Sequence, residues 1–292
     1  MTAGNAWKSL TGGGNSRGIL LAVDFDTTGR PEARFADLLA NLGPEFAAWE
    51  TVPPAADAEA ARSGAGYLDH WTRGLADLTG HSGTDGVTGG LTGTDGERPA
   101  VHAVLGFCGG AIYAAALAER IAEQQDEAPL LVLFDPELST AQTLIWQFHK
   151  VIGFLSAVIS EEQIAEAREM GQQAFDEIPD VMALKDELLR LMREFGEPAL
   201  IAAGLDETRR EELFAVFESF LCYLAAASQI DPLPRWRSAV SYSSTSPLSG
   251  LNAMRSAGLE IEVGEEIRID TDHGVMLADK ELASAVARLL DR

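Results

Sequence analysis

The residues with the clearest capacity for chemistry form a short glycine-rich segment around Cys108. An apolar run from Ala100, typical of a short buried strand, ends in Leu105-Gly106-Phe107-Cys108-Gly109-Gly110, and a helical pattern opens at Gly109. A cysteine therefore stands where a strand turns sharply into a helix. This is the nucleophile-elbow pattern G-x-S-x-G, with sulfur in place of the hydroxyl. We expect the helix N-terminus to favour a thiolate at Cys108 and an oxyanion beside it.

A thiol nucleophile needs a base, and we assign that role to His273. The elbow motif places its histidine after the last strand, in the chain order nucleophile, acid, histidine. His273 is the one of the five histidines that fits, because it follows the apolar stretch ending at Asp270 and precedes the final predicted helix, 282–290. The other four lie in or before the elbow strand or in a long helical block. His273 is therefore the predicted general base.

The base needs an acid to orient it, and Asp135 is the predicted acid. It directly follows a buried strand, 130–134, which is the next strand after the elbow. Some relatives of the motif carry the acid one strand later, but no Asp or Glu occurs between Pro232 and Leu259. Asp270 and Asp272 lie too close to His273 in the chain to be obvious orienting groups. We interpret them as groups that tune its surroundings.

An oxyanion hole should combine the backbone N–H of the residue after the nucleophile with one from the loop after the first buried strand. The first donor is Gly109. The loop follows the apolar run 18–23, and Thr27 is the preferred second donor, with Asp26 next. Backbone donors leave little trace in side-chain identity, so this pair rests on position alone.

Composition narrows the function classes. The chain has 292 residues, of which 46% are hydrophobic, and a formal net charge of −23, which argues against nucleic acid as a partner because phosphate binding needs clustered cations. Its two cysteines form no C-x-x-C pair, and Cys222 lies in an apolar helical stretch where packing explains it. No signal peptide or membrane-spanning run is evident. We expect a cytoplasmic protein with reduced thiols; the oligomeric state is not indicated.

Strand and helix patterns alternate along most of the chain, which predicts an α/β fold with a mostly parallel sheet covered on both faces. From residue 137 to 233 only helical patterns occur. We therefore predict a core of residues 1–136 and 234–292 and a helical insertion of residues 137–233, acting as a lid or, alternatively, as a second packed domain. Residues before about 16 and the Gly/Thr-rich segment 79–97 are expected to be mobile.

These features together resemble the thioesterase domains of non-ribosomal peptide and polyketide synthetases, within the α/β-hydrolase superfamily. The resemblance runs from about Gly18 to Leu290. It rests on Gly106-Phe107-Cys108-Gly109-Gly110, Leu131-Val132-Leu133-Phe134-Asp135-Pro136 and Asp272-His273-Gly274-Val275-Met276-Leu277. It implies an α/β-hydrolase fold, a helical lid, and release of acyl or peptidyl groups from the phosphopantetheine arm of a carrier protein. No metal or organic cofactor is implied.

Two departures from that family bear on the chemistry. Most relatives have serine where this chain has Cys108, and the glycine-rich signature after the first strand is reduced to Thr28-Gly29. Transfer from a carrier thioester to a cysteine gives another activated thioester, which suits release by an internal amine or hydroxyl as well as by water. The alternatives are a non-hydrolytic acyltransferase with the same triad, a dienelactone-hydrolase-like enzyme, and an inactive binding module.

Overall fold

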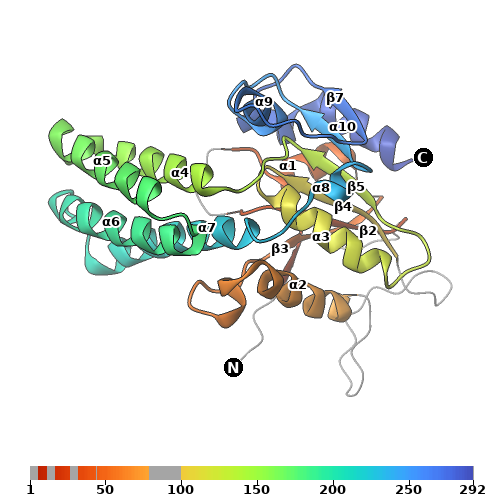
Figure 1. Ribbon diagram of the computed structural model, residues 1–292. Helices are drawn as coiled ribbons and strands as arrows, with labels where there is room; N and C mark the ends of the chain where they lie inside the picture. Colours follow the sequence, from red (N-terminus) through yellow and green to blue (C-terminus); the bar gives the residue numbers. More distant parts are fainter. Residues whose placement is uncertain (1–5, 12–16, 27–31, 44, 79–99, 292) are drawn as a thin grey trace. The chain divides into compact units, whose positions relative to one another are not determined.

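The computed structural model describes residues 6–11, 17–26, 32–43, 45–78 and 100–291 (Figure 1). The chain forms two compact units. The first comprises Met1–Pro54, Ala65–Glu137 and Ile230–Arg292, and the second comprises Ala55–Gly64 and Leu138–Gln229. The segment 79–97 lies outside the described residues, as does Thr27.

A single sheet of seven strands organises the described part of the first unit. The strands are β1 (Trp7–Ser9), β2 (Ile19–Val23), β3 (Ala47–Thr51), β4 (Val101–Phe107), β5 (Leu130–Phe134), β6 (Val240–Ser243) and β7 (Glu265–Arg268). Their order across the sheet is β1-β3-β2-β4-β5-β6-β7, and every pairing is parallel except that of β1 with β3. The predicted α/β architecture with a mostly parallel sheet is confirmed.

Helices cover both faces of this sheet because its central strands are apolar on both sides. The helical elements of the unit are α1 (Phe35–Leu42), α2 (Gly64–Leu78), α3 (Gly110–Ala122), α8 (Leu233–Trp236), α9 (Gly250–Ser256), η3 (His273–Ala278) and α10 (Lys280–Leu290). One face packs Leu105 and Phe134 against α1 and α10. The opposite face carries α3, which approaches β4 at Gly106, where a Cβ would lie 2.7 Å from Ala111 Cα.

The antiparallel edge strand β1 corrects the expectation of a mobile N-terminal segment. Trp7 is 3% exposed, and its indole N–H donates to the backbone carbonyl of Trp71 at 2.9 Å. Trp71 in turn donates to the carbonyl of Val52 at 2.9 Å. Residues 7–9 are therefore held against β3 by backbone pairing and against α2 by Trp7, whereas residues 1–5 and 12–16 lie outside the described residues.

The last strand is shorter than the sequence pattern predicts. Strand signals occur in the sequence from Leu259 to Ile269, but β7 covers only Glu265–Arg268. Gly264 lies against the carbonyl of Ala239, 2.9 Å from where its Cβ would be, so the chain bends there before it joins the sheet. Three hydrophobic residues before the bend stay outside the strand.

The second unit is helical throughout its described residues. Its elements are η1 (Glu59–Arg62), α4 (Ala141–Phe154), η2 (Leu155–Ala157), α5 (Glu161–Glu177), α6 (Val181–Ala202) and α7 (Glu207–Ala227). All four α-helices begin at side chains that accept a backbone N–H of the first turn, which stabilises their N-termini: Thr140, Ser160, Asp180 and Asp206. Large apolar side chains fill its interior, among them Phe148, Ile152, Leu188 and Leu221.

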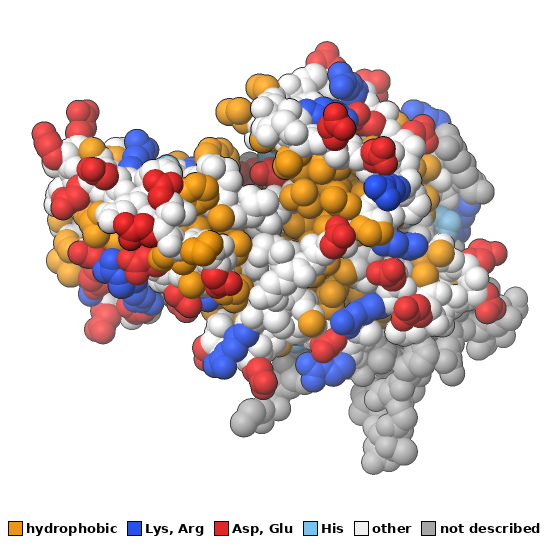
Figure 2. Space-filling model, viewed as in Figure 1, with side chains coloured by type: hydrophobic (Ala, Val, Ile, Leu, Met, Phe, Trp, Pro, Cys, Tyr) orange, Lys and Arg blue, Asp and Glu red, His pale blue; other side chains and the backbone are white. Residues whose placement is uncertain are grey.

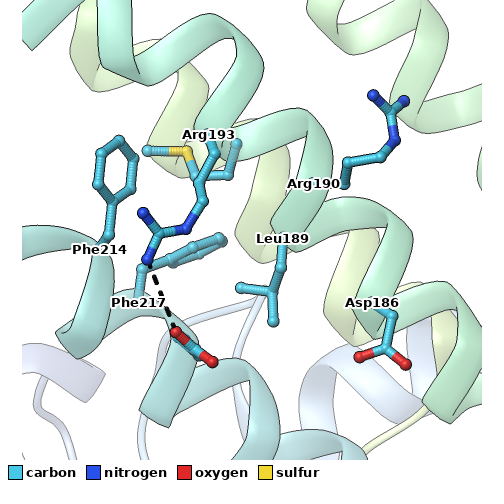
Figure 3. A pocket seen from close by; sticks show the side chains of 8 residues that line it. Asp186, Leu189, Arg190, Arg193, Phe214 and Phe217 are labelled. Atoms are coloured by element: carbon cyan, nitrogen blue, oxygen red, sulfur yellow. Dashed lines mark ion pairs between the residues drawn. The ribbon is translucent and has the colours of Figure 1, made fainter. Parts of the chain in front are cut away.

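A pocket of about 210 Å³ lies between α6 and α7 within this unit (Figure 3). The guanidinium of Arg193 lies over the ring of Phe214, 4.8 Å from its centroid, and pairs with Glu211 at 3.1 Å. The pocket contains none of the predicted catalytic residues. No helix in the described part of the chain is both long and apolar enough to cross a membrane.

Candidate active site

Cys108 follows directly on β4, in a backbone conformation that few side chains adopt. Its φ is +51°, in the left-handed region, which costs a non-glycine residue on the order of 1 kcal/mol or more. The turn is held because Ala111 N–H donates to the Cys108 carbonyl at 3.1 Å. Gly110 passes so close to β2 that a Cβ there would lie 2.2 Å from the carbonyl oxygen of Val23. The elbow predicted from the glycines is therefore present as a strained strand-to-helix turn.

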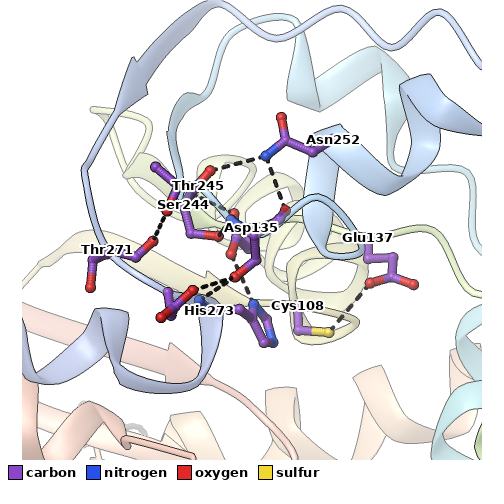
Figure 4. Close-up of polar contacts among 10 residues, drawn as sticks. Cys108, Asp135, Glu137, Ser244, Thr245, Asn252, Thr271 and His273 are labelled. Carbon is purple, nitrogen blue, oxygen red and sulfur yellow. Dashed lines mark hydrogen bonds and ion pairs between the residues drawn. The ribbon is translucent and has the colours of Figure 1, made fainter.

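Asp135 directly follows the neighbouring strand β5 and forms a hydrogen-bonded pair with His273 (Figure 4). Asp135 Oδ2 lies 2.8 Å from His273 Nδ1, and Asp135 Oδ1 accepts the Ser244 backbone N–H, also at 2.8 Å. Asp135 is completely buried. A carboxylate on Nδ1 favours the tautomer whose Nε2 accepts a proton, which is the state a general base requires.

The loop before His273 fixes the position of the ring. The His273 backbone N–H donates to Ser246 Oγ at 2.9 Å, and Asn252 Nδ2 donates to the carbonyls of Ser244 and Ser246. The imidazole stacks on Phe107, the residue before Cys108, with ring centroids 4.7 Å apart. The structure therefore brings the predicted acid, the predicted base and the elbow together.

The side chain in hydrogen-bonding contact with the thiol is that of Glu137, which was not among the predicted site residues. Cys108 Sγ lies 3.9 Å from Glu137 Oε2, and the Glu137 backbone N–H donates to the Cys108 carbonyl at 3.3 Å. Between the described side chains of Cys108 and His273 there is no hydrogen bond. In this structure the thiol is therefore turned toward Glu137.

The electrostatics of the thiol differ from the sequence expectation. Burial raises the pKa of Cys108 well above its usual range, and the carboxylates of Glu137, Asp24 and Asp135 raise it further. A hydrogen bond from the Gly109 backbone N–H to the sulfur lowers that pKa, but by less. The expected thiolate is thus not favoured at rest, because desolvation and neighbouring negative charge exceed the effect of the helix N-terminus.

The predicted oxyanion-hole residues have different outcomes. Gly109 is the N-cap residue of α3, and its N–H points to the Cys108 sulfur. The Asp26 side chain pairs with Lys8 and, at 3.2 Å, with Arg34. Thr27 lies outside the described residues. The second donor stays a prediction.

Sequence reasoning missed Glu137, Ser244 and Gly250. The signal for Glu137 was its place in Asp135-Pro136-Glu137, only two residues after the acid, but it was assigned to the start of the helical insertion. Ser244 acts through its backbone N–H, which the identity of its side chain does not reveal. Gly250 has a φ of +56° and packs on Asp135 so closely that a Cβ would lie 2.7 Å from the Asp135 Cα.

Charge outside the site is mostly negative. Figure 2 shows Asp and Glu side chains spread over the visible face, in keeping with the net charge of −23. Within the ranges that the structure describes, no group of three or more His, Cys, Asp or Glu residues is arranged to hold a metal ion.

The order of the parallel strands and the helices on both sides define an α/β-hydrolase fold. Among solved structures, a holo four-domain nonribosomal peptide synthetase bound to AMP and glycine aligns with 98% of this chain at a TM-score of 0.54 and 14% identity. This chain spans about a fifth, 20%, of that protein. At this identity the likeness establishes the fold alone.

Two further solved structures align at lower TM-scores. The NocB thioesterase domain from the nocardicin cluster aligns at 0.49, with 15% identity over 95% of this chain and 96% of that one. An enol-lactonase from Burkholderia xenovorans LB400 aligns at 0.47, with 14% identity over 98% and 94%. No protein family and no curated protein matches the sequence.

Proposed function

We propose that this chain is a carrier-dependent thioesterase or cyclase of natural-product biosynthesis, with a Cys108-His273-Asp135 triad. The observation that supports it most directly is the 2.8 Å hydrogen bond between Asp135 and His273 beside a cysteine at φ +51°. A strained nucleophile at a strand end, next to an imidazole oriented by a buried acid, is the arrangement required for acyl transfer.

In the proposed reaction, the Cys108 sulfur attacks the carbonyl of an acyl group carried on phosphopantetheine. His273 Nε2 takes the thiol proton and delivers it to the departing pantetheine sulfur, so that one thioester is exchanged for another. The Gly109 N–H stands beside the sulfur, where negative charge develops on the carbonyl oxygen. A hydroxyl or amine of the acyl chain, or water, then attacks the thioester and releases the product.

The first test uses an acyl-pantetheine thioester and intact-protein mass spectrometry. We expect a gain of one acyl mass that maps to Cys108 and is absent from the Cys108→Ala variant. A matched control is Cys222→Ala, which removes the other, buried thiol and should leave the adduct intact. An adduct that persists in Cys108→Ala would contradict the covalent mechanism.

A second test separates cyclisation from hydrolysis. Because the Cys108 thioester keeps the activation of the carrier thioester, we propose intramolecular attack as the native route of release. Turnover of a carrier-bound chain in ¹⁸O-labelled water should give an unlabelled ring. A linear acid carrying the solvent oxygen as the main product would identify the enzyme as a hydrolase.

The helical unit as a lid is part of the proposal. Trp146 and Phe154 on α4 are 48% and 70% exposed, so this helix offers two large apolar side chains that an acyl chain could contact. Hydrogen exchange of α4–α7 before and after acylation of Cys108 tests this role. We expect slower exchange in the acyl-enzyme; identical exchange would leave the unit as a packed domain without gating.

A further inference from the structure

The carboxylate of Glu137 is held beside the nucleophile by its own set of contacts. Its backbone N–H donates to the Cys108 carbonyl at 3.3 Å, and the Gly250 backbone N–H donates to its side chain. Gly250 is in turn fixed against Asp135, so that the three residues form one unit. Glu137 Oε2 therefore has a defined place, 3.9 Å from Cys108 Sγ.

The carboxylate of Glu137 has no lysine or arginine partner in the part of the chain that the structure describes. Burial raises its pKa, and the nearby His273 and the Gly250 N–H lower it, which leaves a costly half-buried acid facing the reaction centre. The contrast with Asp135 is direct, because Asp135 has both oxygens satisfied by an imidazole and a backbone N–H.

The contact with the thiol is too weak to explain why a carboxylate is placed beside Cys108. At 3.9 Å it is long even for a sulfur donor, and S–H···O bonds are weak. The carboxylate also works against the nucleophile, because its charge raises the pKa of Cys108. Glu137 makes the thiol of the free protein harder to deprotonate. Its placement is best explained if the substrate brings a positive charge that pairs with it.

We propose that Glu137 is a specificity residue that binds an ammonium group of the substrate beside Cys108. This rests on the proposed function, since it names the class of acyl chain that the same site accepts: one with a free amine near the reacting carbonyl. The ammonium neutralises the carboxylate and removes one of the negative charges that keep Cys108 protonated. Occupation of the site and activation of the nucleophile are thus coupled.

The first experiment needs no turnover and measures the charge preference of Cys108 directly. In a Cys222→Ser background, the labelling rate is compared for methanethiosulfonates carrying 2-aminoethyl (cationic), methyl (neutral) and 2-sulfonatoethyl (anionic) groups. In each case Cys108 forms a mixed disulfide and methanesulfinate leaves. Each rate is divided by that of 2-mercaptoethanol, which removes the intrinsic reactivity of the reagents.

We expect the cationic-to-neutral ratio to fall about 3- to 10-fold in Glu137→Gln, the size expected for one charge at short range in a largely aqueous setting. The neutral reagent should also react faster, since the thiol loses a negative neighbour. Glu137→Asp keeps the charge and should keep the preference. Glu265→Gln removes an equal charge from exposed β7 and should change nothing. Glu137→Met replaces the Gln variant if that variant does not fold.

The second experiment tests the substrate class. Two acyl-pantetheine thioesters of equal length, one ending in an ammonium and one in its acetamide, are compared for acylation of Cys108. The ammonium chain should acylate faster in the wild type and lose that advantage in Glu137→Gln. If neither chain acylates, the proposed function fails while the labelling ratio still reports on Glu137. An equal cationic-to-neutral ratio in wild type and Glu137→Gln would overturn the proposal.

Discussion

Two regions of the first unit bury a carboxylate at the carboxyl end of a strand, and they stabilise it differently. At the end of β5, the 0%-exposed Asp135 is bound by an imidazole and a backbone N–H. On β3, the 1%-exposed Glu50 pairs with the Lys8 ammonium at 2.7 Å, and burial raises the pKa of Glu50 to about 7. Neutral donors leave the first carboxylate free to orient a ring, whereas the second is buried beside a lysine and keeps its proton up to a pH of about 7.

The largest expected effect is a loss of turnover when Asp135 is changed, which a change of Glu50 should not cause. Asp135→Asn should lower turnover by about 10³–10⁴-fold, because the amide no longer holds His273 in the required tautomer. His273→Ala should give a similar loss, and the double variant should lose little more, as members of one catalytic unit behave. Steady-state kinetics on an acyl-pantetheine thioester provide the measurement.

The control in the other region is Glu50→Gln. We expect its turnover to stay within about threefold of wild type, because Glu50 contacts none of the proposed catalytic residues. Asp270→Asn tests the remaining acid near the base. Wild-type turnover in Asp135→Asn together with an inactive Asp270→Asn would show that the acid is assigned to the wrong residue.

The next effect concerns the contact between the first residue of α3 and the end of β2, the strand beside β3. Gly110→Ala places a Cβ 2.2 Å from the Val23 carbonyl, where β2 ends, and should destabilise the fold by about 1–3 kcal/mol. Urea unfolding measures this change. Gly274→Ala is the matched control, because no atom lies within 4 Å of its added Cβ. Equal stability of the two variants would show that the elbow is not packed against β2.

A smaller effect is the pH dependence caused by Glu50. Because its folded pKa is about 7, folded Glu50 keeps a proton that the unfolded chain releases near pH 4.5. Its contribution to stability is therefore complete below pH 4.5 and falls as pH rises toward 7, by roughly 1–3 kcal/mol. The stability of wild type relative to Glu50→Gln should fall across that window. Parallel profiles for the two proteins would remove Glu50 as the source.

The smallest effect is expected at the second cysteine. Cys222 is 6% exposed on α7 in ordinary helical backbone, so Cys222→Ala should cost about 1 kcal/mol and leave turnover unchanged. Thermal unfolding and the acylation assay check both parts. Loss of acylation in this variant would mean that Cys222, and not Cys108, is the acylated residue.

Much of the site could be predicted because its signals are local. The glycines around Cys108 report a tight turn, and Asp135 and His273 each follow a strand in the expected order. Glu137 could not be assigned, because its contacts are with the Gly250 N–H and the Cys108 sulfur, which are distant in the chain. The state of the thiol was missed for the same reason: burial depends on the whole fold.

The fold shows the same division between local and distant causes. The central strands are continuous apolar runs and are readily recognised, whereas β1 is only three residues long and depends on Trp7 reaching α2. The predicted strand from Leu259 failed where Gly264 meets the carbonyl of Ala239. Alternation of apolar residues reports which side chains can be buried but not where the backbone must bend.

The left-handed backbone at Cys108 also limits how this position can evolve. At φ +51° a branched β-carbon meets severe steric conflict, so threonine is a poor replacement there. Cysteine and serine are unbranched, and their codons differ by a single nucleotide. In the proposed mechanism, a lineage can therefore exchange the thioester intermediate for an ester in one mutational step, without rebuilding the turn, whereas threonine is disfavoured by stereochemistry.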